Sequence, residues 1–395
     1  MTDTDSKKLL AGILLLAAIV RLLFVFMVFG DYRPTADALH WHVMAQNFLN
    51  GRGLMVNEKM IAYRTPLPGL YFALIYSIFG VSFRAVQIAN VFLGVFTVWL
   101  AYDLVRRSFG VISAHWSAFF VSVYPTILLY TGQMLSETLV VMLIMLALWL
   151  VWWLRDRPAI WLTPVGIVLG LAVLTRQTAL PIAVLIALWT LVGRCTNGWL
   201  PRISRPLMIF ACLVLTIAPW TARNYIVTGK FIPLTSEGGS SLWLANNPRT
   251  ADGKKVRSIP QVDALPEGER GPAYQKLALQ FIRENPLQFA RLALRRLQYF
   301  WHLGYHGEGF AEIAFLVFYF PMLSLFAIGT WIGLRLNRHA VLLLLTVPIS
   351  LTAVHMVFWP TGRYRLPVEL IVCMLAGVGA ARTFSKTTES RIATP

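Results

Sequence analysis

Long apolar segments recur along the chain, many of them close to the length that crosses a lipid bilayer. About 20 apolar residues span the hydrocarbon core, and 57% of the 395 residues are hydrophobic while only 13% are charged. Each span must be helical, because lipid cannot satisfy free backbone groups. The sequence therefore predicts an all-α, polytopic membrane helix bundle with about ten transmembrane helices. They are expected at Leu9–Phe29, Arg84–Val105, Ile112–Tyr130, Leu139–Leu154, Trp161–Leu174, Ala179–Val192, Leu207–Ala222, Ile313–Leu334, Ala340–Phe358 and Leu366–Ala381.

Lysine and arginine in the short connections predict the orientation, since basic residues favour the cytoplasmic side. Lys7 and Lys8 precede the first span, and every second connection after it is basic. With ten helices, all of these connections and both termini are cytoplasmic. The apolar run Leu67–Phe79 would invert the pattern if it crossed the membrane. At about 13 residues it is expected to be an interfacial or re-entrant helix.

Two segments on the outer side are long, and all other connections are short. We treat residues 1–395 as one membrane domain with an outer loop 1 at about 30–83 and an outer loop 2 at about 223–312. The apolar spacing predicts helices within these loops. They are Ala36–Leu49, Ala273–Asn285 and Leu287–Trp301. The last is basic and amphipathic, which suits a helix at the membrane interface and equally a helix packed on the rest of its loop.

The net charge of +17 has two sources. Inner basic residues follow the insertion rule, but the outer loops are basic as well, which that rule does not explain. An outer basic surface suggests an anionic ligand or lipid headgroups, and nucleic acid fits poorly on that side. The three cysteines lie in or beside spans, so no disulfide framework is implied.

Asp37, near the start of the first outer-loop helix, is a candidate general base. A carboxylate at neutral pH can accept the proton of a hydroxyl while that hydroxyl attacks an electrophile. Asp31 is the rival, being closer to the first span. Asp37 could equally be an acid that the helix dipole favours in the first turn.

Three short outer turns carry ionisable residues, which are costly at span ends and therefore candidates for function. They hold Glu137, Arg176, and the pair Arg363 and Arg365. The planar fork of arginine fits phosphate through two parallel hydrogen bonds. The alternative is that these arginines pair structurally with Glu137 or Glu369.

Metal ligands and nucleotide motifs have little support. His40 and His42 beside Asp37 lack the ligand count of a strong zinc motif, as do His302 and His306 with Glu308. No Gly-rich phosphate loop and no Gly-x-Ser-x-Gly elbow is present. We therefore expect no cofactor and no metal, with a divalent ion as the lesser alternative.

Four stretches carry a resemblance when taken in order. They are ADALHWHVMAQNFLNGRG, AYRTPLPGLYFALIYSIFG, RNYIVTGKFIPLTSEGGSSLWLANNP and GRYRLPVE. The chain resembles the GT-C superfamily of membrane glycosyltransferases. Within it, the bacterial branch related to the aminoarabinose transferase of lipid A and to protein O-mannosyltransferases is the most similar.

The resemblance implies an inverting transferase that uses a polyprenyl-phosphate sugar at the outer, periplasmic face of the bacterial plasma membrane. Its partners would be that donor, membrane lipids, and a glycan, lipid or protein acceptor. Related enzymes often carry a soluble domain after the last span, whereas this chain stops shortly after Ala381. Acceptor recognition would therefore fall to the two outer loops, mainly the second. In this chain Asp37 would be the base, Arg64, Arg176, Arg363 and Arg365 would hold the lipid phosphate, and Tyr63, Glu137, Asn246, Asn247 and Tyr364 would contact substrate.

Two other functions stay open at this point. A flippase or transporter of lipid-linked sugars would favour inverted repeats and broken spans at matching positions, and neither is visible. A polymer ligase with a lipid-diphosphate donor would use a similar set of arginines. The sequence names neither the sugar nor the acceptor.

Overall fold

Helices make up nearly all of the chain that the structure describes. The structure is a computed structural model, and it describes residues 2–192, 199–251, 258–301 and 310–392. Within these ranges there is no β-strand beyond an isolated bridge between Asn57 and Met60. The predicted all-α fold class is therefore confirmed.

Each predicted span coincides with helical structure. The bundle consists of α1 (Asp3–Leu23) continued by η1 (Phe24–Val28), α4 (Phe83–Phe109), α5 (Val111–Val123), α6 (Pro125–Thr131), α7 (Glu137–Trp153), η2 (Ala159–Leu162) with α8 (Thr163–Thr175), α9 (Ala179–Trp189) with η3 (Thr190–Val192), α10 (Trp199–Thr228), α16 (Phe310–Val357), and α17 (Leu366–Ile392) preceded by η4 (Gly362–Arg365).

Five of the described helices are long and apolar enough to cross a membrane, or six if α5 and α6, bent by 53°, count as one span. The regions of α7, α8 and α9 are shorter apolar helices. The chain thus has the character of a multi-pass membrane protein. The run Leu67–Phe79 forms α3, which has the predicted bounds. It is shorter than the membrane-spanning helices and packs on α2 (Ala36–Leu49).

The predicted spans Ile313–Leu334 and Ala340–Phe358 correspond to the two arms of one bent helix, α16. The arms meet at Asn337, whose φ of −154° and ψ of 81° are not helical. The Asn337 side-chain oxygen accepts a hydrogen bond of 3.2 Å from the Ala340 amide and so caps the second arm.

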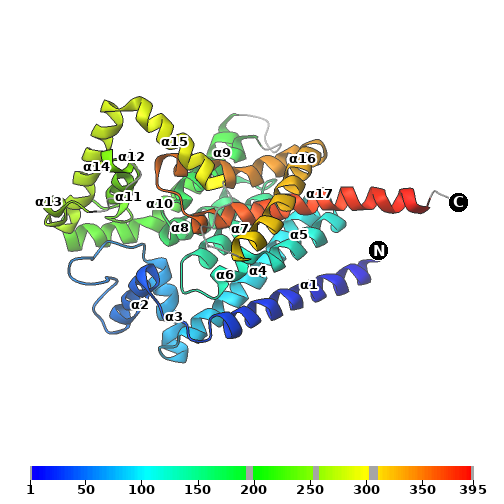
Figure 1. Ribbon diagram of the computed structural model, residues 1–395, viewed down its shortest axis with the longest axis horizontal. Helices are drawn as coiled ribbons and strands as arrows, with labels where there is room; N and C mark the ends of the chain where they lie inside the picture. Colours follow the sequence, from blue (N-terminus) through cyan, green and yellow to red (C-terminus); the bar gives the residue numbers. More distant parts are fainter. Residues whose placement is uncertain (1, 193–198, 252–257, 302–309, 393–395) are drawn as a thin grey trace.

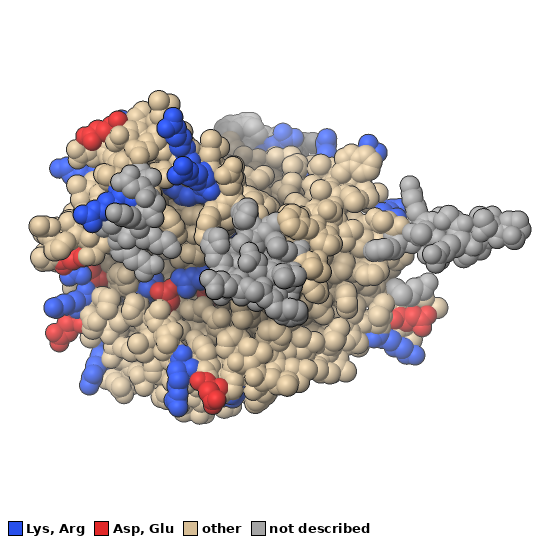
Figure 2. Space-filling model, in the orientation of Figure 1, with Lys and Arg blue, Asp and Glu red and all other residues tan. Residues whose placement is uncertain are grey.

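Both termini lie at one end of the molecule, and the two long loops gather at the other (Figure 1). Charged side chains lie mostly toward these two ends, and few lie among the tan side chains drawn between them (Figure 2). A band poor in charges between two charged ends is what a bilayer requires. Two termini on one side of the membrane would require an even number of crossings; this, and the cytoplasmic position of both termini, stay predictions.

The long loops hold the remaining helices. These are α2 in loop 1 (about 30–83), and α11 (Gly238–Ala245), α12 (Pro248–Ala251), α13 (Pro260–Asp263), α14 (Glu267–Glu284) and α15 (Pro286–Trp301) in loop 2 (about 223–312). Helix α14 begins at Glu267 rather than at Ala273, because it continues through Pro272. Two acids in its first turn, Glu267 and Glu269, favour that earlier start.

Small residues allow α16 and α17 to approach closely. A Cβ atom added at Gly329 would overlap the carbonyl oxygen of Leu375, and one at Gly379 would overlap that of Leu325. Helices in membranes gain from such contact because lipid supplies no hydrophobic drive between them. Because η4 leads directly into α17, this packing also holds the turn η4 in place.

We expect Gly329→Ala to destabilise the protein by about 1–3 kcal/mol, because the methyl group forces two backbones apart. Thermal unfolding in detergent measures this effect. Gly12→Ala is the matched control, since an added Cβ there meets nothing within 4 Å. Equal unfolding temperatures for the two variants would contradict the close packing.

Candidate active site

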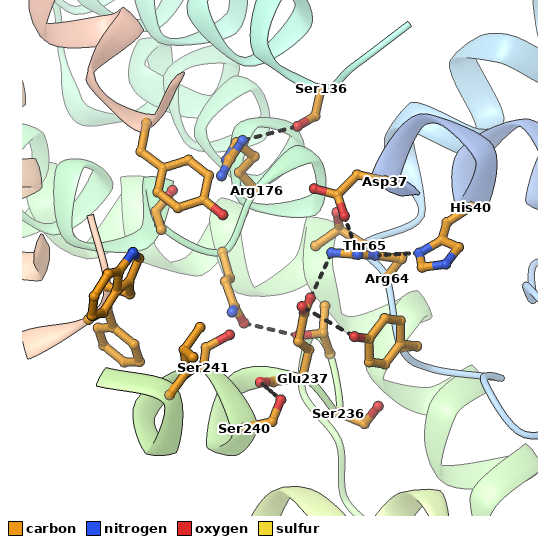
Figure 3. Close-up of a pocket in the computed structure, with 18 of the residues that line it drawn as sticks. Asp37, His40, Arg64, Thr65, Ser136, Arg176, Ser236, Glu237, Ser240 and Ser241 are labelled. Atoms are coloured by element: carbon orange, nitrogen blue, oxygen red, sulfur yellow. Dashed lines mark hydrogen bonds and ion pairs between the residues drawn. The ribbon is translucent and has the colours of Figure 1, made fainter. Parts of the chain in front are cut away.

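A cavity of about 890 Å³ lies at the end of the molecule where loops 1 and 2 meet. We call it the chamber. Its walls come from the start of α2, residues 60–65, the end of α8, α11, α14, and residues 355–364. Segments far apart in the sequence thus surround one space, and Figure 3 shows the side chains that they direct into it.

Asp37 lies in the chamber wall with both of its carboxylate oxygens engaged. Oδ1 accepts a hydrogen bond of 2.5 Å from Arg64 Nη2, and Oδ2 accepts one from Arg363 Nη2. The preceding residue, Ala36, has φ of 46°, an uncommon value for a residue other than glycine. Strained backbone of this kind is found where the surroundings fix a side chain in place.

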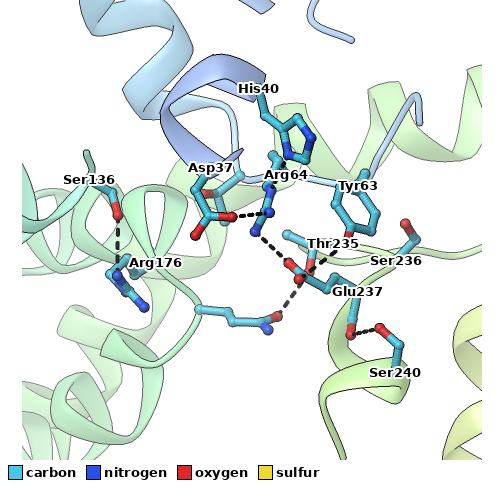
Figure 4. A network of polar contacts seen from close by, with 12 residues as sticks. Asp37, His40, Tyr63, Arg64, Ser136, Arg176, Thr235, Ser236, Glu237 and Ser240 are labelled. Atoms are coloured by element: carbon cyan, nitrogen blue, oxygen red, sulfur yellow. Dashed lines mark hydrogen bonds and ion pairs between the residues drawn. The ribbon is translucent and has the colours of Figure 1, made fainter. Parts of the chain in front are cut away.

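Arg64 is held on three sides. Besides Asp37, its Nη1 donates to Glu237 Oε2 at 2.7 Å and its Nε donates to His40 Nδ1 at 3.1 Å. The Tyr63 hydroxyl donates to the other Glu237 oxygen at 3.4 Å. Figure 4 shows this network, in which one loop 1 arginine joins carboxylates from both loops.

A second cluster adjoins the first. Arg176 Nη1 is 2.5 Å from Glu137 Oε1, and Arg363 Nε is 3.5 Å from the same oxygen. The guanidinium of Arg176 lies 4.3 Å from the ring centroid of Tyr364. Arg363 therefore connects the two clusters, since it contacts both Asp37 and Glu137. Three arginines and three carboxylates alternate in the order Glu237, Arg64, Asp37, Arg363, Glu137 and Arg176.

The surroundings shift the pKa values of the loop 1 groups. Burial by itself raises the pKa of Asp37, but Arg64 and Arg363 outweigh it, so the pKa lies below its usual value. Burial, followed by Arg64, lowers the pKa of His40. Burial and Glu237 raise the pKa of Tyr63 to about 12. At neutral pH Asp37 is therefore ionised, and His40 and Tyr63 are neutral.

The structure brings most of the predicted site residues together. Those that line the chamber are Asp37, Tyr63, Arg64, Arg176, Arg363 and Tyr364. Glu137 lies just behind the wall, with a side chain only 2% exposed. Asp31, the rival base, is exposed and is not among the lining residues.

Three predicted residues lie elsewhere. Arg365 is buried, bonds Glu369 at 2.9 Å and donates to the Phe300 carbonyl at 3.0 Å. The tight turn η4 separates it from Arg363, because residues two apart on such a turn face different sides. Asn246 and Asn247 are buried and donate to carbonyls of α11. The structure thus gives Arg365 the structural pairing with Glu369 that the sequence left open, and makes the asparagines caps of α11.

Two acids of loop 2 were not identified from the sequence. Glu237 contacts Arg64, and Glu267 accepts hydrogen bonds from the amides of Ile61 and Ala62 at 2.6 and 3.0 Å. Loop 2 contains several acids, and nothing in its local sequence separates these two from the others. A search for acids able to balance the loop 1 arginines could have raised Glu237 as a candidate.

The two histidines of loop 1 that were weighed as metal ligands have different partners. His40 faces Arg64, whereas His42 shares a hydrogen bond of 2.9 Å with the Tyr76 hydroxyl. In the described part of the chain no three His, Cys, Asp or Glu side chains gather as metal ligands would. The residues 302, 306 and 308 lie outside the described residues, so that candidate stays a prediction.

Comparison with known proteins supports the fold and a family likeness. The family model for dolichyl-phosphate-mannose-protein mannosyltransferase matches residues 63–221, less than half of the chain. The oligosaccharyltransferase AglB from Archaeoglobus fulgidus, solved with an inhibitory peptide and a dolichol-phosphate, matches with a TM-score of 0.65 at 14% identity. The match covers 98% of this chain and 51% of AglB. The apo form of the A. fulgidus oligosaccharyltransferase gives a TM-score of 0.62 at 12% identity, covering 97% of this chain and 51% of that enzyme.

ArnT from Cupriavidus metallidurans, bound to undecaprenyl phosphate, also matches, at 13% identity over 97% of this chain and 79% of ArnT. Its TM-score is 0.47, and the fold assignment does not depend on it. No curated protein matches by sequence.

The fold is therefore of the GT-C type, and the resemblance that the sequence indicated is confirmed at the level of fold and family model. The chain spans about half the length of the archaeal oligosaccharyltransferase. The similarity is to glycosyltransferases, and it fits the arginine-rich chamber that the helices surround.

The His40 contact predicts a pH dependence of stability. Because folding lowers the pKa of His40, the unfolded chain takes up the proton first as the pH falls, and stability is lost below about pH 6.5. We expect His40→Gln, which keeps an acceptor for Arg64, to weaken this loss. Unfolding temperatures between pH 5 and 8 measure it; an unchanged slope in the variant would contradict the assignment.

Proposed function

We propose that the protein is a glycosyltransferase that moves a sugar from a polyprenyl-phosphate donor to a hydroxyl of a cell-envelope acceptor. The observation that carries the proposal is the chamber, which Arg64, Arg176 and Arg363 line together with Asp37, and two of these arginines contact that carboxylate. Arginine forks bind phosphate oxygens through paired hydrogen bonds. A nearby carboxylate can accept the proton of the attacking hydroxyl. The likeness to AglB, which was solved with a dolichol-phosphate, supports this donor class.

An apolar groove of about 480 Å³ adjoins the chamber and suits the lipid part of the donor. The two share Gln177, Thr235 and Phe358 among their lining residues. Apolar side chains of α9 and of the segment before α11 form one part of its lining, namely Leu180, Pro181, Phe231, Ile232, Pro233 and Leu234. An isoprenoid chain in the groove would place its phosphate in the chamber, near Arg176.

The reaction that this arrangement suits is a direct displacement. The acceptor oxygen bonds to the anomeric carbon as the bond from that carbon to the phosphate oxygen breaks, which inverts the sugar. The electron pair of the broken bond stays on the lipid phosphate, where Arg176 and Arg363 stabilise the added charge. Asp37 takes the acceptor proton. No metal is required in this scheme, although a divalent ion stays an alternative.

Binding of the donor would also release the base. Arg64 and Arg363 occupy both oxygens of Asp37, so that carboxylate is poorly placed to accept a proton. A phosphate that draws Arg363 toward itself would free one oxygen and weaken the effect that holds the pKa of Asp37 down. We therefore propose that the donor binds before the acceptor.

The position of the loops and the basic connections support a location for the chamber relative to the membrane. Both long loops lie opposite the two termini (Figure 1), and the short basic connections favour cytoplasmic termini. The proposed chamber then opens on the outer face of the bacterial plasma membrane.

We expect Asp37→Asn to lower sugar transfer by a factor of about 10²–10⁴, the usual contribution of a general base. Donor binding should be retained or strengthened, because the asparagine no longer competes for the arginines. The assay uses purified protein in detergent with a polyprenyl-phosphate sugar and a cell-envelope extract. Transfer without a bilayer also excludes a pure transporter.

Asp31→Asn is the matched control, an equally conservative change in the same loop at an exposed residue. It should leave transfer unchanged. Full activity of Asp37→Asn would overturn the choice of base, and loss in Asp31→Asn alone would give that role to Asp31.

Arg363→Gln should weaken donor binding by roughly 10- to 100-fold, since hydrogen bonds to charged groups contribute about 1.5–3 kcal/mol. The control is Arg365→Gln combined with Glu369→Gln, which removes a neighbouring ion pair without leaving a lone buried carboxylate. The control should keep donor affinity, measured by titration with polyprenyl phosphate. Equal losses in both variants would show that Arg363 acts only through stability.

A further inference from the structure

Helix α15 has two different faces. Its buried side consists of Leu292, Ala293, Arg296 and Phe300. Residues on the opposite side are exposed, and Leu287 and Leu294 reach 77% and 58% exposure. We call Leu287, Arg291, Leu294 and Arg295 the α15 outer face; they recur at the spacing of one helix surface.

The buried side of α15 sets its depth relative to the membrane. Arg296 Nη1 donates to the carbonyls of Met356 and Val357 at 2.7 and 2.8 Å, and Trp301 Nε1 donates to Thr352 Oγ1 at 3.0 Å. Thr352, Met356 and Val357 lie in the last turns of the helix Val317–Val357, which is long and apolar enough to cross a membrane. The second half of α15 therefore lies where that span leaves the hydrocarbon, at the level of the lipid headgroups.

The α15 outer face carries positive charge without compensation from its own helix. Residues 286–301 contain three arginines and no Asp or Glu. Arg296 is turned inward, where it caps α16 and also donates to the Ala245 carbonyl at 2.9 Å. Within the described residues, Arg291 and Arg295 are exposed and form no ion pair. Figure 2 shows basic side chains over α15 on the visible face.

We propose that the α15 outer face binds the anionic phospholipid headgroups of the leaflet in which the protein is embedded. Arginine can extend its guanidinium to a phosphate while its methylene groups lie along apolar surface. Leu287 and Leu294, beside the arginines on this face, would enter the upper acyl region, as in other interfacial helices. A second copy of the same face is a poor partner, because it would oppose arginine with arginine.

Lipid bound here would act on the loop that covers the chamber. Arg296 joins α15 to the ends of α11 and α16 through Ala245, Asn246 and Val357. Both α11 and the segment after α16 line the chamber. Anchoring the outer side of α15 would hold this wall in place against the membrane surface.

The test measures which lipid gathers at the α15 outer face. A fluorescent label is attached to Leu294→Cys in full-length protein, in lipid nanodiscs of equal parts phosphatidylglycerol and phosphatidylcholine. Either the anionic or the zwitterionic lipid carries a nitroxide quencher near its headgroup, at the same mole fraction. The native cysteines are replaced by alanine beforehand, at Cys195, Cys212 and Cys373.

We expect the anionic quencher to be at least about twofold more effective than the zwitterionic one, because each arginine near the surface attracts anionic lipid. The ratio should fall toward one in Arg291→Gln/Arg295→Gln and in high salt. Arg52→Gln/Lys59→Gln is the matched control, as it removes the same charge from exposed positions of loop 1 and should keep the ratio.

Three results would overturn the proposal. The first is a wild-type ratio of one, and the second is a label that neither lipid quenches, which would place the face in water. The third is an equal fall in ratio for both double variants, which would assign the effect to overall charge rather than to α15.

Discussion

The position of Asp37 between Arg64 and Arg363 is the interaction on which the rest of the site depends. It connects the start of α2, the segment before α3 and the turn before α17; Arg363 of that turn is 326 residues from Asp37 along the chain. Through Glu137 and Glu237 the same arginines reach α7 and loop 2. Each charge is partly buried, so each needs an opposite charge nearby to be stable there. The chamber therefore exists as one balanced network rather than as independent side chains.

The two loops pack together into one wall of the chamber, because charged side chains of loop 2 form hydrogen bonds with backbone groups in an irregular segment of loop 1. Glu267 accepts from two loop 1 amides, and Arg223 donates to the carbonyls of Ile61 and Leu54 at 2.9 and 3.0 Å. Buried backbone groups without such partners would be costly. This arrangement lets an irregular segment carry Tyr63 and Arg64 in fixed positions. The chemistry proposed for the chamber needs side chains in fixed positions, because the arginines must already point at the phosphate site when the donor binds.

Much of the fold was accessible from the sequence, because bilayer length and apolar composition restrict a span strongly. The bounds of α2 and α3 were predicted correctly, and the kink at Asn337 falls between two predicted spans. The predicted start of α14 at Ala273 was wrong, because the helix begins at Glu267 and continues through Pro272. The site was accessible in part: ionisable residues at span ends identified Glu137, Arg176 and Arg363, but Arg365 satisfies the same rule and is bonded to Glu369. Sequence position alone does not distinguish the two arginines, because η4 turns them to different sides.

Composition and periodicity, which act locally, were enough to predict a helical membrane protein with two long basic loops and an acid near the start of loop 1. Which charges meet depends on the tertiary structure. It places Asp37, and not Asp31, in the chamber wall, adds Glu237 and Glu267, and turns Arg296 inward while leaving Arg291 and Arg295 exposed. The reason is physical: an ion pair across 326 residues depends on how helices pack, and no local pattern encodes that distance.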